Sequence, residues 1–184
     1  MGKGAKFERQ ISKELSLWWT EGQRDDVFWR TSQSGGRATI RKKQGKNTKN
    51  QDGDICATDP IGQPLLDITT IELKVGYNSW NIKEIIDSVM RTKNSKLEDF
   101  FEQCQREANA QDKKCWCLIT RQDRRESLIF INNELWKFLR RKKDFLVEIP
   151  NKIIIVHSKF GYIQAMRLGD FFYHISPEIF YEKP

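Results

Sequence analysis

The sequence has no long apolar run, and its 184 residues contain no stretch of about 18 uncharged apolar residues that could cross a bilayer. The N-terminus has no apolar core of the kind that export signals carry, because charge begins at Lys3. We therefore expect a cytoplasmic protein, bacterial, archaeal or from a phage-infected host cell, with no membrane partner. The length fits one domain over residues 1–184, and six tryptophans and eleven phenylalanines supply bulky core material.

Residues that bind zinc are scarce. The four cysteines, Cys56, Cys104, Cys115 and Cys117, have only two histidines as possible co-ligands, both far downstream. Disulfides are not expected in a chain without an export signal. The Cys115-x-Cys117 pair lies inside an apolar run, and its spacing is narrower than that of usual zinc ligand pairs. The sequence therefore favours buried, reduced thiols over a zinc site.

Acidic residues are missing from one long segment, although the chain has 25 of them against 32 lysines and arginines. No acid occurs between Val27 and Gln51, and the net charge of the chain is +7 with a pI near 9.2. We interpret residues 33–51 as a mobile basic loop that a polyanion would neutralise, with solvated surface charge as the alternative. The cations of this loop that we expect to contact nucleic acid are Arg37, Arg41, Lys42 and Lys43.

Hydrophobic periodicity predicts a chain that mixes helices and strands. A helix is expected over residues 3–20, with Phe7, Ile11, Leu15 and Trp18 on its buried stripe. Other helices are expected over residues 82–90, 97–110, 134–141 and 168–173. Strands are expected over residues 27–31, 53–58, 65–75, 115–120, 128–132, 153–157 and 162–167. This order indicates an α/β fold, a mixed central sheet flanked by helices, with residues 133–184 as a C-terminal α/β extension of the core.

Two of the expected strands carry a group of charged side chains. Gly53-Asp54-Ile55 begins one strand, and Ile71-Glu72-Leu73-Lys74 lies within the next. Their separation predicts a hairpin with the two strands side by side, and the period of two puts Glu72 and Lys74 on one face. Glycine before Asp54 permits a close approach of backbone or substrate. The carboxylates of Asp54 and Glu72 would together form a hard-oxygen site suited to Mg²⁺.

Such a site fits phosphodiester hydrolysis, which uses a metal to activate water and a cation to offset charge on the phosphate. Lys74 could supply that cation and position the water, and a base role would require a lowered pKa. The alternative is an ordinary strand whose Glu72 and Lys74 face solvent. Other acids, Asp52, Asp59 and Asp67, lie nearby. Asp54 is preferred because it directly precedes an apolar run.

Taken in order, these residues resemble the PD-(D/E)xK nuclease superfamily, and within it the Holliday junction resolvase-like group and phage-type endonucleases. The resemblance spans roughly residues 2–132 and comprises Gly2-Lys3-Gly4, Phe7-Glu8-Arg9, Arg30, Ser34-Gly35, Gly53-Asp54, Glu72-Leu73-Lys74, Gln103 and Arg121. It implies a restriction-endonuclease-like fold in which Asp54, Glu72 and the backbone carbonyl of Leu73 bind the metal. It also implies Glu8 as a further catalytic acid, with an ordinary helix-dipole role as the alternative.

The resemblance further implies a Mg²⁺-dependent DNA endonuclease, in which Mn²⁺ can substitute, and a homodimer. Arg9, Arg30, Ser34 and Gln103 would contact DNA or lie beside the site. Branched DNA such as a Holliday junction is one candidate substrate.

The long basic loop and the C-terminal extension depart from compact resolvase-like members. A restriction-type nuclease on duplex DNA, an RNA nuclease and a non-catalytic DNA-binding module therefore stay open. Trp80 is the one tryptophan considered for the substrate surface, with core packing preferred.

Overall fold

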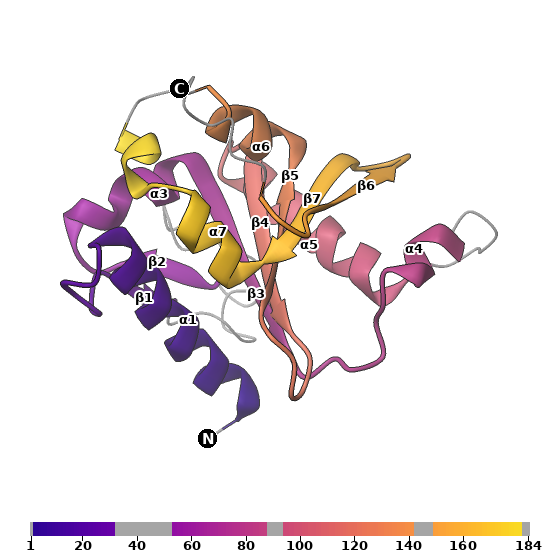
Figure 1. Ribbon diagram of the computed structural model, residues 1–184, viewed down its shortest axis with the longest axis horizontal. Coiled ribbons are helices and arrows are strands. Elements are labelled where there is room, and N and C mark those ends of the chain that lie inside the picture. The colour runs from indigo at the N-terminus through magenta and orange to yellow at the C-terminus, as the bar shows by residue number, and fades with distance from the viewer. Residues whose placement is uncertain (1, 32–52, 88–93, 142–148, 182–184) are drawn as a thin grey trace, which may run out of the picture.

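The computed structural model describes residues 2–31, 53–87, 94–141 and 149–181, and is built around a five-stranded sheet (Figure 1). The strand order is β3-β4-β5-β7-β6. The strands are β3 (Thr69–Val75), β4 (Cys115–Arg121), β5 (Leu128–Asn132), β6 (Ile153–His157) and β7 (Gly161–Arg167). β3 and β4 are parallel and the other neighbours are antiparallel, so the sheet is mixed, as predicted. A separate antiparallel pair joins β1 (Phe28–Arg30) to β2 (Ile55–Ala57).

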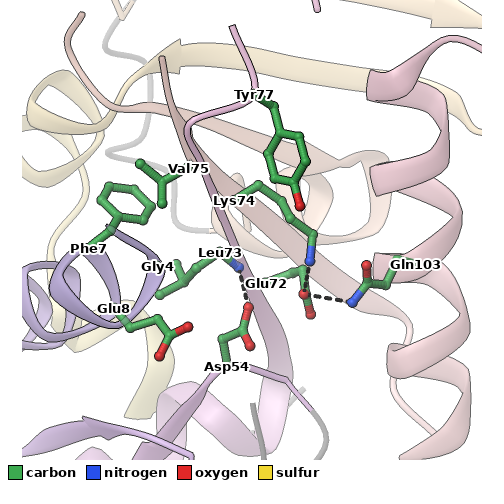
Figure 2. A pocket seen from close by; sticks show the side chains of 10 residues that line it. All are labelled: Gly4, Phe7, Glu8, Asp54, Glu72, Leu73, Lys74, Val75, Tyr77 and Gln103. Carbon is green, nitrogen blue, oxygen red and sulfur yellow. Dashed lines mark hydrogen bonds and ion pairs between the residues drawn. The ribbon is translucent and has the colours of Figure 1, made fainter. Parts of the chain in front are cut away.

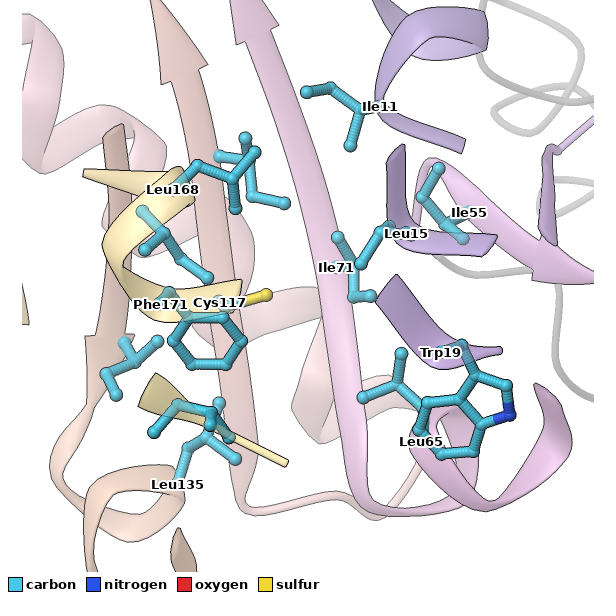
Figure 3. Close-up of a cluster of buried hydrophobic side chains, with 14 of the residues drawn as sticks. Ile11, Leu15, Trp19, Ile55, Leu65, Ile71, Cys117, Leu135, Leu168 and Phe171 are labelled. Atoms are coloured by element: carbon cyan, nitrogen blue, oxygen red, sulfur yellow. The ribbon is translucent and has the colours of Figure 1, made fainter. Parts of the chain in front are cut away.

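Helices cover both faces of the sheet. The helical segments are α1 (Lys3–Trp19), η1 (Pro60–Gly62), α3 (Gln63–Ile68), α4 (Lys83–Asp87), α5 (Lys96–Ala110), α6 (Asn133–Leu139), α7 (Leu168–His174) and η3 (Pro177–Tyr181). Side chains from α1, α3, α6 and α7 meet one face in a core that Figure 3 shows in part. Helix α5 packs on the other face, where Phe101, Trp116 and Phe130 are buried. Within the described residues, no helix is long and apolar enough to cross a membrane.

The long helices form because their apolar stripes have a face of the sheet to cover. Ser95 caps the N-terminus of helix α5: its hydroxyl accepts from the Glu98 backbone N–H, and the Glu98 carboxylate accepts from the Ser95 backbone N–H. Its predicted stripe is buried in full: Leu97, Phe100, Phe101, Cys104 and Ala108. Helix α1 buries three of its four predicted stripe residues, but Trp19 is buried in place of the half-buried Trp18. All four cysteines are free, as predicted, but only Cys104 and Cys117 are buried, and Cys56 and Cys115 are half-buried.

The expected strand over residues 65–75 is wrong in its first part. Residues Gln63–Ile68 form α3, and the strand begins only at Thr69. Proline lies in the first turn of α3, where the missing N–H has no helical partner to lose. Leu65 and Leu66 are both buried from this helix. The apolar run therefore meets the core as a turn and a half of helix before the chain extends.

The expected hairpin is also wrong. β2 pairs with β1, and β3 pairs with β4, so the segments that carry Asp54 and Glu72 are not ladder partners. They are nevertheless adjacent, because the Asp54 backbone N–H donates to the Ile71 carbonyl at 2.9 Å. The C-terminal segment adds β7 and β6 to the same central sheet beside β5. The basic loop predicted over residues 33–51 lies outside the described residues.

Candidate active site

Strand β3 places Glu72 and Lys74 in one hollow. Ile71 and Leu73 point into the core beneath α1, and the alternation of the strand turns Glu72 and Lys74 to the α5 side, as predicted. Glu72 is only 2% exposed, and its Oε1 accepts from the Lys74 Nζ at 2.6 Å. The alternative in which both side chains merely face solvent is therefore wrong.

Asp54 enters the same hollow from the segment that leads into β2. Its Oδ2 accepts from the Leu73 backbone N–H at 2.8 Å, a bond drawn in Figure 2. Gly53 makes this approach possible. It has a φ of 103°, and a Cβ at this position would lie 3.1 Å from the Ile71 carbonyl oxygen and 3.2 Å from Thr70 Cγ2. The tight approach expected for this glycine is therefore present.

Helix α5 contributes a side-chain amide to the site. The Gln103 Nε2 donates to Glu72 Oε1 at 2.8 Å and to Glu107 Oε1 at 2.9 Å. Glu72 Oε1 thus accepts from an ammonium on its own strand and from an amide on the helix packed above it (Figure 2). These two donors fix the rotamer of a carboxylate that has little contact with water.

Helix α1 lines the opposite side of the hollow with Glu8. Its Oε2 accepts from the Arg30 Nη1 at 3.2 Å, so a β1 side chain holds the carboxylate. In Figure 2, Glu8 and Asp54 reach toward each other from separate elements. The hollow has a volume of about 290 Å³, and its lining residues are Gly4, Phe7, Glu8, Asp54, Glu72, Leu73, Lys74, Val75, Tyr77 and Gln103.

Burial sets the charge balance of the site. It raises the pKa of Asp54, which the Leu73 N–H and the nearby Lys74 only partly oppose. It raises the pKa of Glu72 well above its ordinary value, together with the neighbouring carboxylates of Glu107 and Asp54. Burial alone would lower the pKa of Lys74, but the charge and hydrogen bond of Glu72 outweigh it and raise that pKa. The charge of protonated Lys74 thus offsets only part of the negative charge that Asp54 and Glu72 carry when both are ionised.

The remaining predicted residues lie in several places. Arg9 is half-buried on α1 and does not line the hollow. Arg121 ends β4, with its guanidinium 4.8 Å from the centre of the Phe7 ring and donating to Gln10 Oε1. Ser34, Arg37, Arg41, Lys42 and Lys43 lie outside the described residues.

Two residues of the site were missed by the sequence analysis. Glu107 lies one helical turn after Gln103, so the spacing of the two on α5 could have indicated it. Tyr77 lines the hollow, is 43% exposed and packs edge-on against Phe100, with Lys96 near both rings. It follows the end of β3, and no local pattern distinguishes it from an ordinary loop residue.

Comparison with known proteins identifies the family. The model of a family described as "Phage putative PDDEXK endonuclease" matches residues 1–179. Neither a curated protein nor a solved structure matches the chain. The match includes every residue of the hollow and nearly all of the C-terminal segment. With its mixed sheet flanked by helices, the chain therefore belongs to this phage family of the PD-(D/E)xK nuclease superfamily and has a restriction-endonuclease-like fold.

Proposed function

We propose that the chain is a divalent-metal-dependent endodeoxyribonuclease that uses Mg²⁺, with Mn²⁺ able to substitute. One observation carries the proposal. Glu72, which is buried, and Asp54, which is half-buried, both have raised pKa values and converge in the hollow that also holds Lys74. Buried carboxylates without sufficient countercharge are costly to ionise, and a divalent cation removes that cost. The donor set therefore fits a hard cation.

The proposed ligands are the carboxylates of Asp54 and Glu72 and the backbone carbonyl of Leu73. No group of three or more His, Cys, Asp or Glu side chains that could hold a metal occurs in the part of the chain that the structure describes. A site with few protein ligands suits Mg²⁺, which keeps several waters and binds substrate phosphate oxygens. In an extended strand, the N–H and C=O of one residue point to the same side. The Leu73 carbonyl therefore shares the side on which its N–H meets Asp54.

When bound, the metal would polarise the scissile phosphate and lower the pKa of a bound water. The chain's own residues then have separate tasks. Lys74, kept protonated by Glu72, stabilises the charge that builds on the phosphate and positions the attacking water. Gln103 holds the Glu72 carboxylate in place. Glu8, held by Arg30, is a further acid at the edge of the hollow that orients water.

DNA is the proposed substrate, and branched DNA such as a Holliday junction is its proposed specific form. A net charge of +7 and the acid-free basic segment support a polyanionic partner. Arg9, Arg30, Ser34 and the cations of the loop are proposed to contact its backbone. A homodimer is proposed because both strands of a junction or duplex must be cut, and the proposed location is the cytoplasm of the host cell. We also propose that residues 1–184 act as one domain.

Cleavage assays on the full chain test this function. Plasmid, four-way junctions, flaps, linear duplex, single strands and RNA are incubated with Mg²⁺, Mn²⁺ or EDTA. The matched variants are Asp54→Asn, Glu72→Gln and Asp67→Asn, the last changing an exposed acid on α3. We expect metal-dependent DNA cleavage that the first two variants lose and the third retains, with folding of each checked by circular dichroism. Unchanged cleavage in Asp54→Asn and Glu72→Gln would refute the site, and binding without cleavage under any metal would leave only a DNA-binding module.

A further inference from the structure

A second hollow, of about 540 Å³, lies beside the candidate active site. We call it the arginine hollow, and it is lined by Trp80, Thr120, Gln122, Arg124, Arg125, Glu126, Leu128 and Arg167. It shares no lining residue with the active-site hollow. Its volume is within the range of small-molecule pockets and could hold a nucleotide unit.

The sheet register connects the two hollows. Lys74 is the register partner of Thr120, Thr120 of Leu128, and Leu128 of Arg167. Register partners point to the same face, so these four side chains form one row across β3, β4, β5 and β7. Neighbouring strands are about 4.8 Å apart, so the row runs from Lys74 to roughly 14 Å away. Because DNA rises about 3.4 Å per nucleotide, this row spans about one to four nucleotides from a phosphate held at Lys74.

Two buried polar groups of the arginine hollow have no partner in the described part of the chain. They are the Trp80 indole Nε1 and the Thr120 hydroxyl. Trp80 is 5% exposed and Thr120 is 1% exposed. Buried indole N–H and hydroxyl groups normally have a hydrogen-bond partner. An indole N–H can only donate, so a group that binds here and pairs with Trp80 would use an acceptor oxygen or nitrogen.

The charge of the hollow selects an anion. Arg167 is engaged by Asp170 at 2.7 Å and by Glu126 at 3.7 Å. Arg124 and Arg125 are exposed, and neither side chain forms an ion pair with any residue that the structure describes. The lining itself holds three guanidinium groups and one carboxylate, Glu126, and is therefore positive, although Asp170 offsets Arg167 and Asp123 lies near Arg124 from outside the lining. Guanidinium groups bind phosphate oxygens through paired N–H donors.

Hydrogen bonds connect the segments that line the two hollows. The segment after β3 contributes Tyr77 to the active-site hollow and Trp80 to the arginine hollow. The Gln122 side chain donates to the Trp80 carbonyl at 2.6 Å. Asn78 accepts from the Asp123 backbone N–H at 2.8 Å and donates to the Asp123 carboxylate at 3.0 Å. The β4–β5 turn that bears Arg124 and Arg125 is therefore connected to the segment that lines the active site.

We propose that the arginine hollow is a second phosphate-binding subsite, which holds a backbone phosphate of the DNA strand one to four nucleotides from the phosphodiester cut at Lys74. The proposal rests on the function proposed above. The phosphate meets Arg124 and Arg125, and the sugar or base beside it supplies the acceptor that Trp80 and Thr120 lack. Its consequence is that a substrate must extend past the cut on this side for full affinity.

The test pairs the Arg124→Ala/Arg125→Ala double variant with an Arg140→Ala/Arg141→Ala control, which removes two exposed arginines at the end of α6. DNA binding by each full chain is measured by fluorescence anisotropy with Ca²⁺ over a range of salt concentrations. The DNA carries an uncharged methylphosphonate at one position at a time. We expect one methylphosphonate position to weaken binding about tenfold for the native chain and the control. In the Arg124→Ala/Arg125→Ala variant, a methylphosphonate at that position should not weaken binding. The slope of log affinity against log salt concentration should also fall by about 1 to 2 in this variant.

Two further variants separate the subsite from a general effect on folding. Arg124→Gly removes the cation at a position whose φ of 60° suits glycine. Thr120→Val keeps the shape of the side chain and removes the unpartnered hydroxyl, so it should weaken DNA binding without lowering the melting temperature. If each methylphosphonate weakens DNA binding equally in the native chain and in the Arg124→Ala/Arg125→Ala variant, the subsite is refuted. If the methylphosphonate effect depends on Arg124 and Arg125 but the native chain cuts no DNA, only the proposed function is refuted. A native chain that binds no DNA refutes both proposals.

Discussion

Replacing Asp54 by asparagine should stabilise the metal-free protein. The carboxylate is half-buried near Glu72 and Glu8, and its partial removal from water raises its pKa. An acid whose pKa is raised in the folded state stabilises the fold while it is protonated, and this contribution is lost as the pH rises through the raised pKa. At neutral pH the ionised carboxylate is therefore unfavourable. Asparagine removes the charge, and its amide oxygen can still accept from the Leu73 N–H.

The expected gain in free energy of unfolding can be converted to a change in melting temperature from the length of the chain. Removing a destabilising active-site charge commonly adds about 1 kcal/mol to the free energy of unfolding. For a domain of 150 to 250 residues this corresponds to about 2–4 °C in melting temperature. Saturating metal should instead make the native chain more stable than the Asp54→Asn variant. At a concentration of one hundred times its Kd, Mg²⁺ should stabilise the native chain by about 2.7 kcal/mol. Asp54→Asn should gain almost nothing, so the order of the two melting temperatures should reverse on adding metal.

Differential scanning calorimetry in EDTA and in MgCl₂, at mildly acidic and at neutral pH, measures both effects. In EDTA the advantage of Asp54→Asn should shrink as the pH falls, because the native carboxyl then takes up its proton. The exposed acid Asp67 provides the control, since Asp67→Asn should change neither the metal-free stability nor the gain from metal. A variant at Asp54 that melts below the native chain in EDTA and is still stabilised by Mg²⁺ would show that this carboxylate is neither electrostatically strained nor a metal ligand.

Three other substitutions test separate parts of the structure. Lys74→Met should lower single-turnover cleavage by about 10²–10³-fold while the thermal shift with metal persists, and wild-type rates would exclude Lys74 from charge stabilisation. Gln103→Ala should weaken Mg²⁺ binding by about 10–100-fold in titration calorimetry, whereas Gln63→Ala on the far helix α3 should not; equal effects would contradict the positioning role. Gly62→Ala should cost about 1–3 kcal/mol in urea unfolding, because its Cβ would lie 2.8 Å from the side chains of Phe28 and Val27. Gly169→Ala meets open space and should change stability by less than about 0.5 kcal/mol, and similar losses for both glycines would contradict the steric argument.

The parts of the fold that the sequence predicted well are those in which one periodicity extends over a whole element. The structure places β5 and β6 at the predicted residues, and α5 starts within one residue of its expected position. The predicted strand at residues 65–75 was wrong over its first residues because Leu65, Leu66 and Ile68, with Asp67 between them, form a short apolar pattern that fits either a helix or a buried strand. Pro64 was the one local signal for a helix start there.

Strand pairing could not be predicted in the same way, because the partner of a strand is decided by distant parts of the chain. β2 pairs with β1 across the whole basic segment, and β3 pairs with β4 beyond α5. Loop closure over such distances adds little free energy per residue, so sequence separation alone does not favour the nearer partner. The contact from Gln103 to Glu72 depends on the same long-range packing, since α5 must first lie on the sheet.

The position of β3 explains why a short pattern of charged residues can form a site here. β3 is an edge strand of the five-stranded sheet, with β4 on one side. On its other side, the Leu73 N–H binds Asp54 Oδ2 and the Ile71 carbonyl accepts from the Asp54 N–H. In a central strand these backbone groups would be bound by a neighbouring strand, and no carboxylate could reach them. The sequence shows Asp54, Glu72 and Lys74 in the right order, but only an edge strand leaves the backbone between them available to bring the carboxylates together.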